Sequence, residues 1–167
     1  MSKAPKLPGL RTCDIELAVA KHFGWRHNII VPNVSWGLGF RHELDLLVYT
    51  GSGKAWEVEI KVSKQDLLRD ALKAHQHRSE FIHRLYFAVP ETLQDLIQEI
   101  PERAGFIVCR ARPYGRPQVN VVRPARLNPG VKPWPDSRVR KLLELASMRV
   151  WTLKEHLYLK KYSHKRV

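Results

Sequence analysis

The chain has 167 residues, enough for one domain with a hydrophobic core, and 44% of them are hydrophobic, which excludes a largely disordered protein. No run reaches the roughly 18–20 apolar residues of a membrane span, and the start of the chain lacks the apolar core of a signal peptide. We therefore expect a cytoplasmic protein without a membrane partner. The formal net charge of +13 favours a polyanionic partner, nucleic acid first, over a merely basic soluble protein.

A helix is the first element that the pattern predicts. Thr12 is a suitable N-cap, and apolar residues at helical spacing follow over residues 13–22. Glu16 shares a face of this helix with Ala20 and Phe23, so its side chain leans toward the core. By position alone, a surface glutamate at the edge of the apolar stripe is the more common outcome. Residues 27–35 then predict a strand.

This first predicted strand contains Pro32, which cannot donate to the ladder and therefore indicates a sheet edge or a bend. A hairpin follows, because two runs of period-two alternation flank the turn Gly51-Ser52-Gly53. If the turn is centred on Ser52, Asp45 lies opposite Glu59, with Cβ atoms about 4.5–5.5 Å apart. Lys61 points to the same face.

Two carboxylates at this distance repel each other, and a sheet built only for stability would avoid them. A hard divalent cation prefers oxygen ligands and would turn the repulsion into a binding site. The alternative is a solvent-facing strand pair in which Lys61 screens Asp45 and Glu59, a surface ion network worth roughly 0–1 kcal/mol. Because Glu43 and Glu57 extend the acidic face in a strongly basic chain, the metal site is favoured.

A second helix is predicted from Lys64 to about Ala74, and Ser63 and Asp66 match a capping box at its start. A metal site made of His75 and His77 is the weaker interpretation of the segment that follows, against a solvated basic patch that touches phosphates. The DNA-binding candidates share a basic or imidazole side chain near this helix or the C-terminus: Lys64, Arg69, Lys73, His75, His77, Arg78, Lys160 and Lys161.

The rest of the chain alternates between strands and helices. Strands are predicted over 84–89, 105–109 and 119–122, and helices over 92–100, 137–148 and 151–162. Aromatic residues interleaved with lysines in the last helix could stack on nucleic acid, but packing on the core is the more common role. We expect three parts: a core over 1–125, a Pro/Gly linker over 126–135, and a basic helical extension over 136–167 packed on the core.

This order of elements, with an aspartate on one hairpin strand and Glu-x-Lys on the next, resembles the PD-(D/E)XK nuclease superfamily. Within it, the runs EVEIKVSKQDLLRD, RLYFAVP and GFIV are similar to the MmcB-like DNA-repair nuclease family. The resemblance covers about residues 12–148, and Leu44 replaces the proline that often precedes the aspartate. It implies an α/β fold with a restriction-endonuclease-like core, in which a mixed central sheet in the order αβββαβ is flanked by helices.

The resemblance also implies roles for individual residues. Asp45, Glu59 and the carbonyl group of Ile60 would hold Mg²⁺ or Mn²⁺, and Glu16 would be a further or second-metal ligand. Lys61 would orient or help deprotonate the attacking water, with a pKa lowered by the metal and by partial burial.

Three residues at the start of the second helix are near-site residues by the same resemblance: Ser63, Gln65 and Asp66. A helix cap already explains Ser63 and Asp66. The sequence therefore predicts a metal-dependent endonuclease that hydrolyses DNA phosphodiester bonds, selective for single-stranded, branched or damaged DNA in repair or recombination. The alternative is a non-catalytic nucleic-acid-binding protein that retains the nuclease fold. Cutting both strands at once needs two sites, which is consistent with a homodimer.

Overall fold

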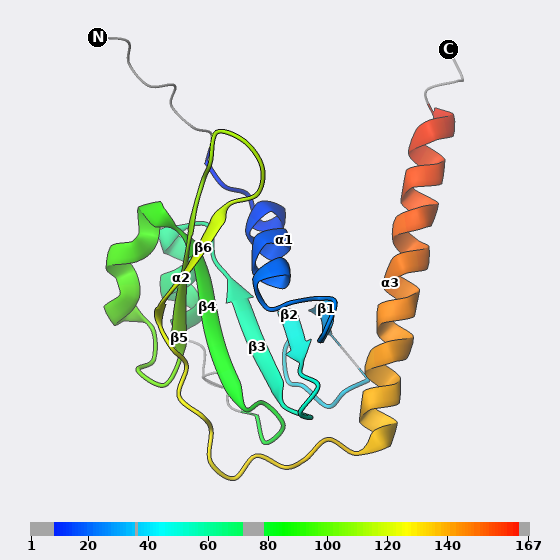
Figure 1. Cartoon of the computed structure of the whole chain (residues 1–167), viewed down its shortest axis with the longest axis horizontal. Helices are drawn as coiled ribbons and strands as arrows, with labels where there is room; N and C mark the ends of the chain where they lie inside the picture. Colours follow the sequence, from blue (N-terminus) through cyan, green and yellow to red (C-terminus); the bar gives the residue numbers. More distant parts are fainter. Residues whose placement is uncertain (1–8, 36, 72–78, 164–167) are drawn as a thin grey trace.

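One six-stranded sheet organises the molecule, with its strands side by side in chain order (Figure 1). The computed structural model describes residues 9–35, 37–71 and 79–163. The strands are β1 (Ile29–Val34), β2 (Leu44–Tyr49), β3 (Ala55–Ile60), β4 (Arg84–Pro90), β5 (Gly105–Arg110) and β6 (Gln118–Arg123). The helices are α1 (Thr12–His22), α2 (Lys64–Ala71), the 3₁₀-helix η1 (Glu91–Glu99) and α3 (Asp136–Ser163).

The sheet is mixed. Strands β1, β2 and β3 form an antiparallel meander, β3, β4 and β5 run parallel, and β6 returns antiparallel to β5. The parallel step from β3 to β4 is made through α2, as a parallel connection requires. The predicted α/β class, with helices flanking a mixed sheet, is confirmed. Among the described residues no helix is both long enough and apolar enough to cross a bilayer.

The hairpin of β2 and β3 has the register that the sequence predicts. Leu46 pairs with Val58 and Leu47 pairs with Glu57. Gly53 closes the turn: its N–H donates to the Thr50 carbonyl oxygen at 2.9 Å, and its φ of 76° is in the left-handed region that favours glycine. Extended by one pair, this register places Asp45 opposite Glu59.

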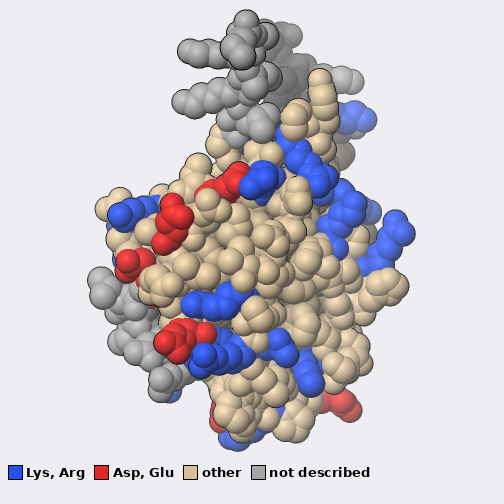
Figure 2. Space-filling model, turned by 60° about the vertical axis from the view of Figure 1, so that its left-hand side comes forward, with Lys and Arg blue, Asp and Glu red and all other residues tan. Residues whose placement is uncertain are grey.

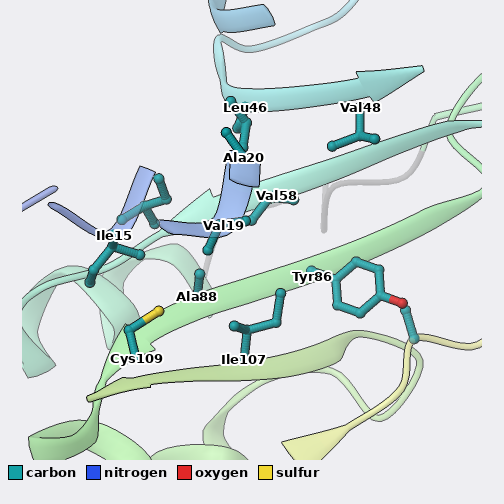
Figure 3. Packing of buried hydrophobic residues seen from close by; sticks show 12 residues of the cluster. Ile15, Val19, Ala20, Leu46, Val48, Val58, Tyr86, Ala88, Ile107 and Cys109 are labelled. Carbon is teal, nitrogen blue, oxygen red and sulfur yellow. The ribbon is translucent and has the colours of Figure 1, made fainter. Parts of the chain in front are cut away.

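The two faces of the sheet are covered by different elements. On one face, Val58 and Leu46 belong to one apolar cluster with Ile15 and Val19 of α1, and Figure 3 shows these side chains in the region where α1 crosses the strands. On the other face, Leu67 of α2 packs with apolar residues of β4 and β5. Both faces of β3 are therefore buried, which decides the environment of the acidic residues that the strand carries.

The first strand and the two terminal helices can be compared with their predictions. The prediction that Pro32 lies in an edge strand is confirmed, because β1 pairs on one side only. The N-cap of α1 is Arg11 rather than Thr12, and the Arg11 backbone N–H donates to Asp14 Oδ2 at 2.9 Å. The two helices predicted near the C-terminus form the single helix α3, because the chain has no glycine or proline between them.

Among the described side chains of helix α3, those in its first half pack on the core of the molecule. Leu142 is fully buried in a cluster with Leu44 and Trp134. Farther along, apolar side chains are exposed, and the expectation that they pack on the core is wrong. The exposed fractions are 66% for Trp151 and 60% each for Leu153, Leu157 and Tyr158.

Candidate functional site

The Lys61 ammonium group lies among three carboxylates. Its Nζ atom is 2.7 Å from Glu59 Oε2, 3.5 Å from Asp45 Oδ2 and 3.8 Å from Asp70 Oδ1. These residues come from β2, β3 and α2 and from the residue directly after β3. The structure therefore brings Asp45, Glu59 and Lys61 together, as the sequence predicts, and adds Asp70 to them.

Main-chain hydrogen bonds fix this group where β3 ends. The Ile60 N–H donates to Asp45 Oδ2 at 2.7 Å, which ties the aspartate of β2 to β3. The Lys61 N–H donates to the Ala88 carbonyl oxygen of β4 at 3.0 Å. Ser63 Oγ accepts the Asp66 N–H at 3.2 Å, so Ser63 caps α2 as predicted. The start of α2 is thereby set, and with it the position of Asp70.

The burial of these side chains excludes the alternative interpretation, in which they form an ion network on a solvent-facing strand pair. The side chains of Glu59 and Asp70 are each 2% exposed, and that of Lys61 is 11% exposed. Asp45 is the most open member, with 33% of its side chain exposed. A surface ion network of negligible energy does not describe such a group. The opening at Asp45 is the side from which a ligand can reach it.

A second contact lies beside the first, between His42 and the glutamates of β3. His42 Nε2 is 2.8 Å from Glu57 Oε1 and 4.0 Å from Glu59 Oε1. Glu57 is fully buried, and the His42 side chain is 16% exposed. Glu59 therefore presents one oxygen to Lys61 and the other to His42. The three ligand atoms of His42, Glu57 and Glu59 all lie within 4.8 Å of one another.

The site shifts the pKa of its members. Burial is the main cause that raises the pKa of Glu59 to about 7, and the charges of Asp45 and Glu57 add to it against the opposing effect of Lys61. Burial lowers the pKa of Lys61, but attraction by Glu59, Asp45 and Asp70 outweighs it, so the pKa is raised. This direction is opposite to the lowered pKa expected from the sequence. In the protein alone, Lys61 is a cation and not a base.

Glu16 lies at the border of this group. Its side chain is half-buried on α1, and its pKa is raised first by burial and then by the negative charge of Asp45. The two carboxylates therefore interact electrostatically. The half-buried position of Glu16 agrees with its predicted lean toward the core.

The remaining predicted residues lie outside this ion-paired group or outside the described residues. Gln65 and Asp66 are exposed on the first turn of α2, and Arg69 pairs with Asp66 at 3.9 Å. Lys64, Lys160 and Lys161 are exposed. Glu43 is also exposed and precedes β2, so it does not extend the buried acidic group. Four predicted DNA contacts lie outside the described residues: Lys73, His75, His77 and Arg78.

Sequence reasoning assigned no role to His42 or Asp70 and counted Glu57 only as an acid on the sheet face. The spacing of the sequence indicates the positions of two of these residues, Asp70 and Glu57. Asp70 lies three residues after the buried Leu67, which is the spacing of one helical face. Glu57 lies two residues before Glu59 on β3, so both side chains point to the same face of the sheet. His42 precedes β2 in an irregular segment, where no periodicity indicates the direction of its side chain.

Basic side chains are spread over at least one face of the molecule. On the face shown in Figure 2, Lys and Arg side chains form several separate groups, and acidic side chains lie between them. The acidic group around Lys61 thus belongs to a molecule whose net charge is strongly positive.

Comparisons with known proteins bear on the fold. No protein-family model matches the chain. No curated protein matches it. A solved structure, SPO1766 protein of unknown function from Silicibacter pomeroyi, matches with a TM-score of 0.61 and 21% sequence identity over 95% of this chain and 97% of that chain. At this identity the similarity shows a shared fold alone.

Proposed function

We propose that this protein is an Mg²⁺- or Mn²⁺-dependent endonuclease that hydrolyses DNA phosphodiester bonds. The observation that carries the proposal is the meeting of Asp45, Glu59 and Lys61 at the end of β3, with the lysine within 3.5 Å of both carboxylates. A sheet built for stability alone would not place two facing acids, one of them buried, beside one lysine. Phosphodiester hydrolysis needs such a group, to bind a cation and to neutralise developing charge.

The arrangement of elements supports a restriction-endonuclease-like assignment. The first six elements follow the order helix, three strands, helix, strand, and β3 and β4 are parallel. The aspartate lies on β2 and the Glu-x-Lys sequence ends β3, as the resemblance to the PD-(D/E)XK superfamily implies. This assignment is part of the proposal, since the shared fold with the SPO1766 protein carries no activity.

The donor set fits a hard divalent cation. Asp45 and Glu59 offer carboxylate oxygens side by side, the ligands that Mg²⁺ and Mn²⁺ prefer. The carbonyl group of Ile60 is the third donor in this assignment, and Glu16 is a further carboxylate near Asp45. The bound cation would act as a Lewis acid on the scissile phosphate.

Lys61 has the role of a cation in this proposal. Its raised pKa keeps the ammonium group protonated at neutral pH. A protonated lysine neutralises phosphate charge and donates hydrogen bonds that orient the attacking water. Lys61 does not accept the proton of the attacking water, because an ammonium group has no lone pair.

The net charge of the protein and the opening of the site support DNA as the substrate. The formal net charge of +13 attracts a polyanion, and the site opens at Asp45 rather than into an enclosed cavity. Exposed basic residues of α2, Lys64 and Arg69, lie in the helix that follows Lys61 and are suited to contact phosphates. Cutting of both strands would need a second copy of the chain.

The test is cleavage of single-stranded, duplex and branched DNA with Mg²⁺ or Mn²⁺, comparing the wild type with Asp45→Ala and Lys61→Ala. We expect metal-dependent cleavage by the wild type and a loss of at least about 100-fold in both variants. Arg140→Ala is the matched control, because Arg140 is an exposed cation of α3 paired with Glu144. Its rate should equal that of the wild type.

Two results would contradict the proposal. If the wild type cleaves none of these substrates, the protein is not such an enzyme, and salt-dependent binding without cleavage would favour the non-catalytic nucleic-acid-binding alternative. If cleavage survives both Asp45→Ala and Lys61→Ala, the active site lies elsewhere in the molecule.

A further inference from the structure

A histidine and two carboxylates converge beside the site already described, and the proposed endonuclease reaction does not use two of them. His42 Nε2 lies 2.8 Å from Glu57 Oε1 and 4.0 Å from Glu59 Oε1. Both glutamates are almost fully buried, at 0% and 2% exposure. Their side chains are held by neighbouring positions of one strand, so the separation of the two carboxylates is set by β3 itself.

We propose that His42, Glu57 and Glu59 bind one divalent transition-metal ion, with Zn²⁺ as the best fit. The position is distinct from the one assigned to Mg²⁺ or Mn²⁺ beside Asp45, because Glu59 would contribute its Oε1 atom here while Oε2 faces Lys61. The inference does not depend on whether the protein cleaves DNA.

The distances are close to those of a zinc site. Zinc–ligand bonds of about 2.0–2.1 Å in a tetrahedron separate the ligand atoms by roughly 3.4 Å. The observed separations from His42 Nε2 are 2.8 and 4.0 Å, one shorter and one longer than this value. Movements of about half an ångström would bring these two separations to this value, and the third separation, between the two carboxylate oxygens, is within 4.8 Å.

The ligand types select the metal. Imidazole nitrogen suits Zn²⁺ and other transition-metal ions, whereas Mg²⁺ prefers oxygen ligands and retains several waters. Three protein ligands leave a fourth position for water, as in zinc sites with an open position. Two negative charges beside one neutral histidine would balance the charge of a divalent ion.

The site has a route of entry. His42 lines a surface pocket together with Arg41, Phe40 and Glu80. Its side chain is 16% exposed, whereas the two glutamates lie behind it. An ion would therefore arrive from the side of His42 and replace the contact between His42 and Glu57.

The test uses the full-length protein, dialysed against a chelator and then titrated with Zn²⁺ in competition with a chromogenic chelator. We expect one Zn²⁺ per chain. His42→Ala and Glu57→Gln should each weaken binding at least tenfold. Co²⁺ titration gives a second measurement, because visible absorption bands of Co²⁺ in a low-coordinate site should appear in the wild type and be lost in His42→Ala.

Two control variants make the result specific. His156→Ala removes an exposed histidine of α3 and should bind Zn²⁺ as the wild type does. Asp45→Asn alters the neighbouring position and should also retain the single Zn²⁺. Circular dichroism of each metal-free variant checks folding, and Glu57→Gln, which keeps the size of the side chain, serves if His42→Ala does not fold.

Four outcomes would overturn the inference. The first is that the wild type binds no Zn²⁺ more tightly than millimolar. The second is that His42→Ala and Glu57→Gln both retain the wild-type affinity. The third is that His156→Ala weakens binding as much as His42→Ala does, which would indicate surface histidines. The fourth is that Asp45→Asn abolishes Zn²⁺ binding, which would place the ion at the Asp45 position. Absence of DNA cleavage with Zn²⁺ binding intact would contradict only the proposed function.

Discussion

Strand β3 has two faces that are buried to a similar degree and differ completely in chemistry. Val58 and Ile60 point into the apolar cluster under α1, at 0% and 5% exposure. Glu57 and Glu59 point to the opposite face, at 0% and 2% exposure. In an ordinary half-buried strand, alternation separates core from solvent. Here it separates an apolar core from a buried ionic group.

The two faces have opposite effects on stability. Burial of an apolar side chain stabilises the fold by about 1.5–3 kcal/mol, whereas a buried carboxylate loses hydration that its partners replace only in part. The apolar face of β3 therefore stabilises the sheet against the cost of the acidic face. Substitutions on the two faces should therefore differ in their effects on activity and on the free energy of unfolding.

The largest difference is expected for Glu59→Gln. This change should lower metal-dependent DNA cleavage by at least about 100-fold, because it removes a charged oxygen ligand. The free energy of unfolding at pH 8 should stay equal or rise, because a neutral amide is less costly to bury than a carboxylate. Cleavage rates and urea denaturation of the same preparation measure both effects. A large loss of stability together with lost cleavage would show that the acidic face of β3 stabilises the fold, contrary to this prediction.

Lys61→Met should destabilise the metal-free protein by about 3–5 kcal/mol at pH 8, because buried carboxylates lose their shared counterion. Glu59, Asp45 and Asp70 all lie within 3.8 Å of its Nζ atom. Denaturant titration at pH 8 and pH 5 is the measurement, and the loss should shrink at pH 5, where protonation of Glu59 removes one of these charges. Equal losses at both pH values would argue against an electrostatic cause.

The stability of the metal-free protein should fall as the pH rises through the range in which Glu59 ionises. The pKa of Glu59 is raised from 4.5 to about 7, so the folded state binds more protons than the unfolded state between these values. By linkage, the contribution of Glu59 to the free energy of unfolding is greatest below pH 4.5. It falls as the pH rises to 7 and above, by up to about 3 kcal/mol in total. The difference between wild type and Glu59→Gln, followed from pH 4.5 to 8.5, isolates the contribution of this one group. A difference that does not change with pH would contradict the raised pKa.

Val58→Ala tests the apolar face and has the smallest expected effect. The loss of two buried methyl groups should destabilise the protein by about 2 kcal/mol through lost burial and a residual cavity. Metal-dependent cleavage, measured well below the unfolding temperature, should remain near the wild-type rate. A strong loss of cleavage in a folded Val58→Ala protein would show that the two faces are not separable.

Much of the hairpin could be predicted from the sequence because its determinants are local. Alternation and the turn at Gly53 fix the register, and the register places Asp45 opposite Glu59. The burial of Glu57 and Glu59 could not be predicted in this way. It depends on Leu67, Leu85 and Phe87, which reach the same face of the sheet from elements later in the chain.

The site beyond the hairpin was less predictable for the same reason. Asp70 contacts Lys61 only because α2 folds back over the sheet, and His42 is directed by a segment without periodic structure. The C-terminal region was predicted correctly as helical, but the predicted packing on the core is wrong for its second half. Nothing in the apolar pattern of α3 distinguishes Leu142, which meets the core, from Leu157, which lies beyond it.

The hydrogen bond from Lys61 N–H to the Ala88 carbonyl oxygen has a consequence for the order of folding. The β2–β3 hairpin closes a short loop and can form early, which brings Asp45 and Glu59 together while Lys61 is still unanchored. The parallel pairing of β3 with β4 joins parts of the chain more distant in sequence and is expected to form later. We therefore expect the charges of the site to be compensated last, so that a folding chain passes through a stage in which its acidic hairpin is at its most repulsive.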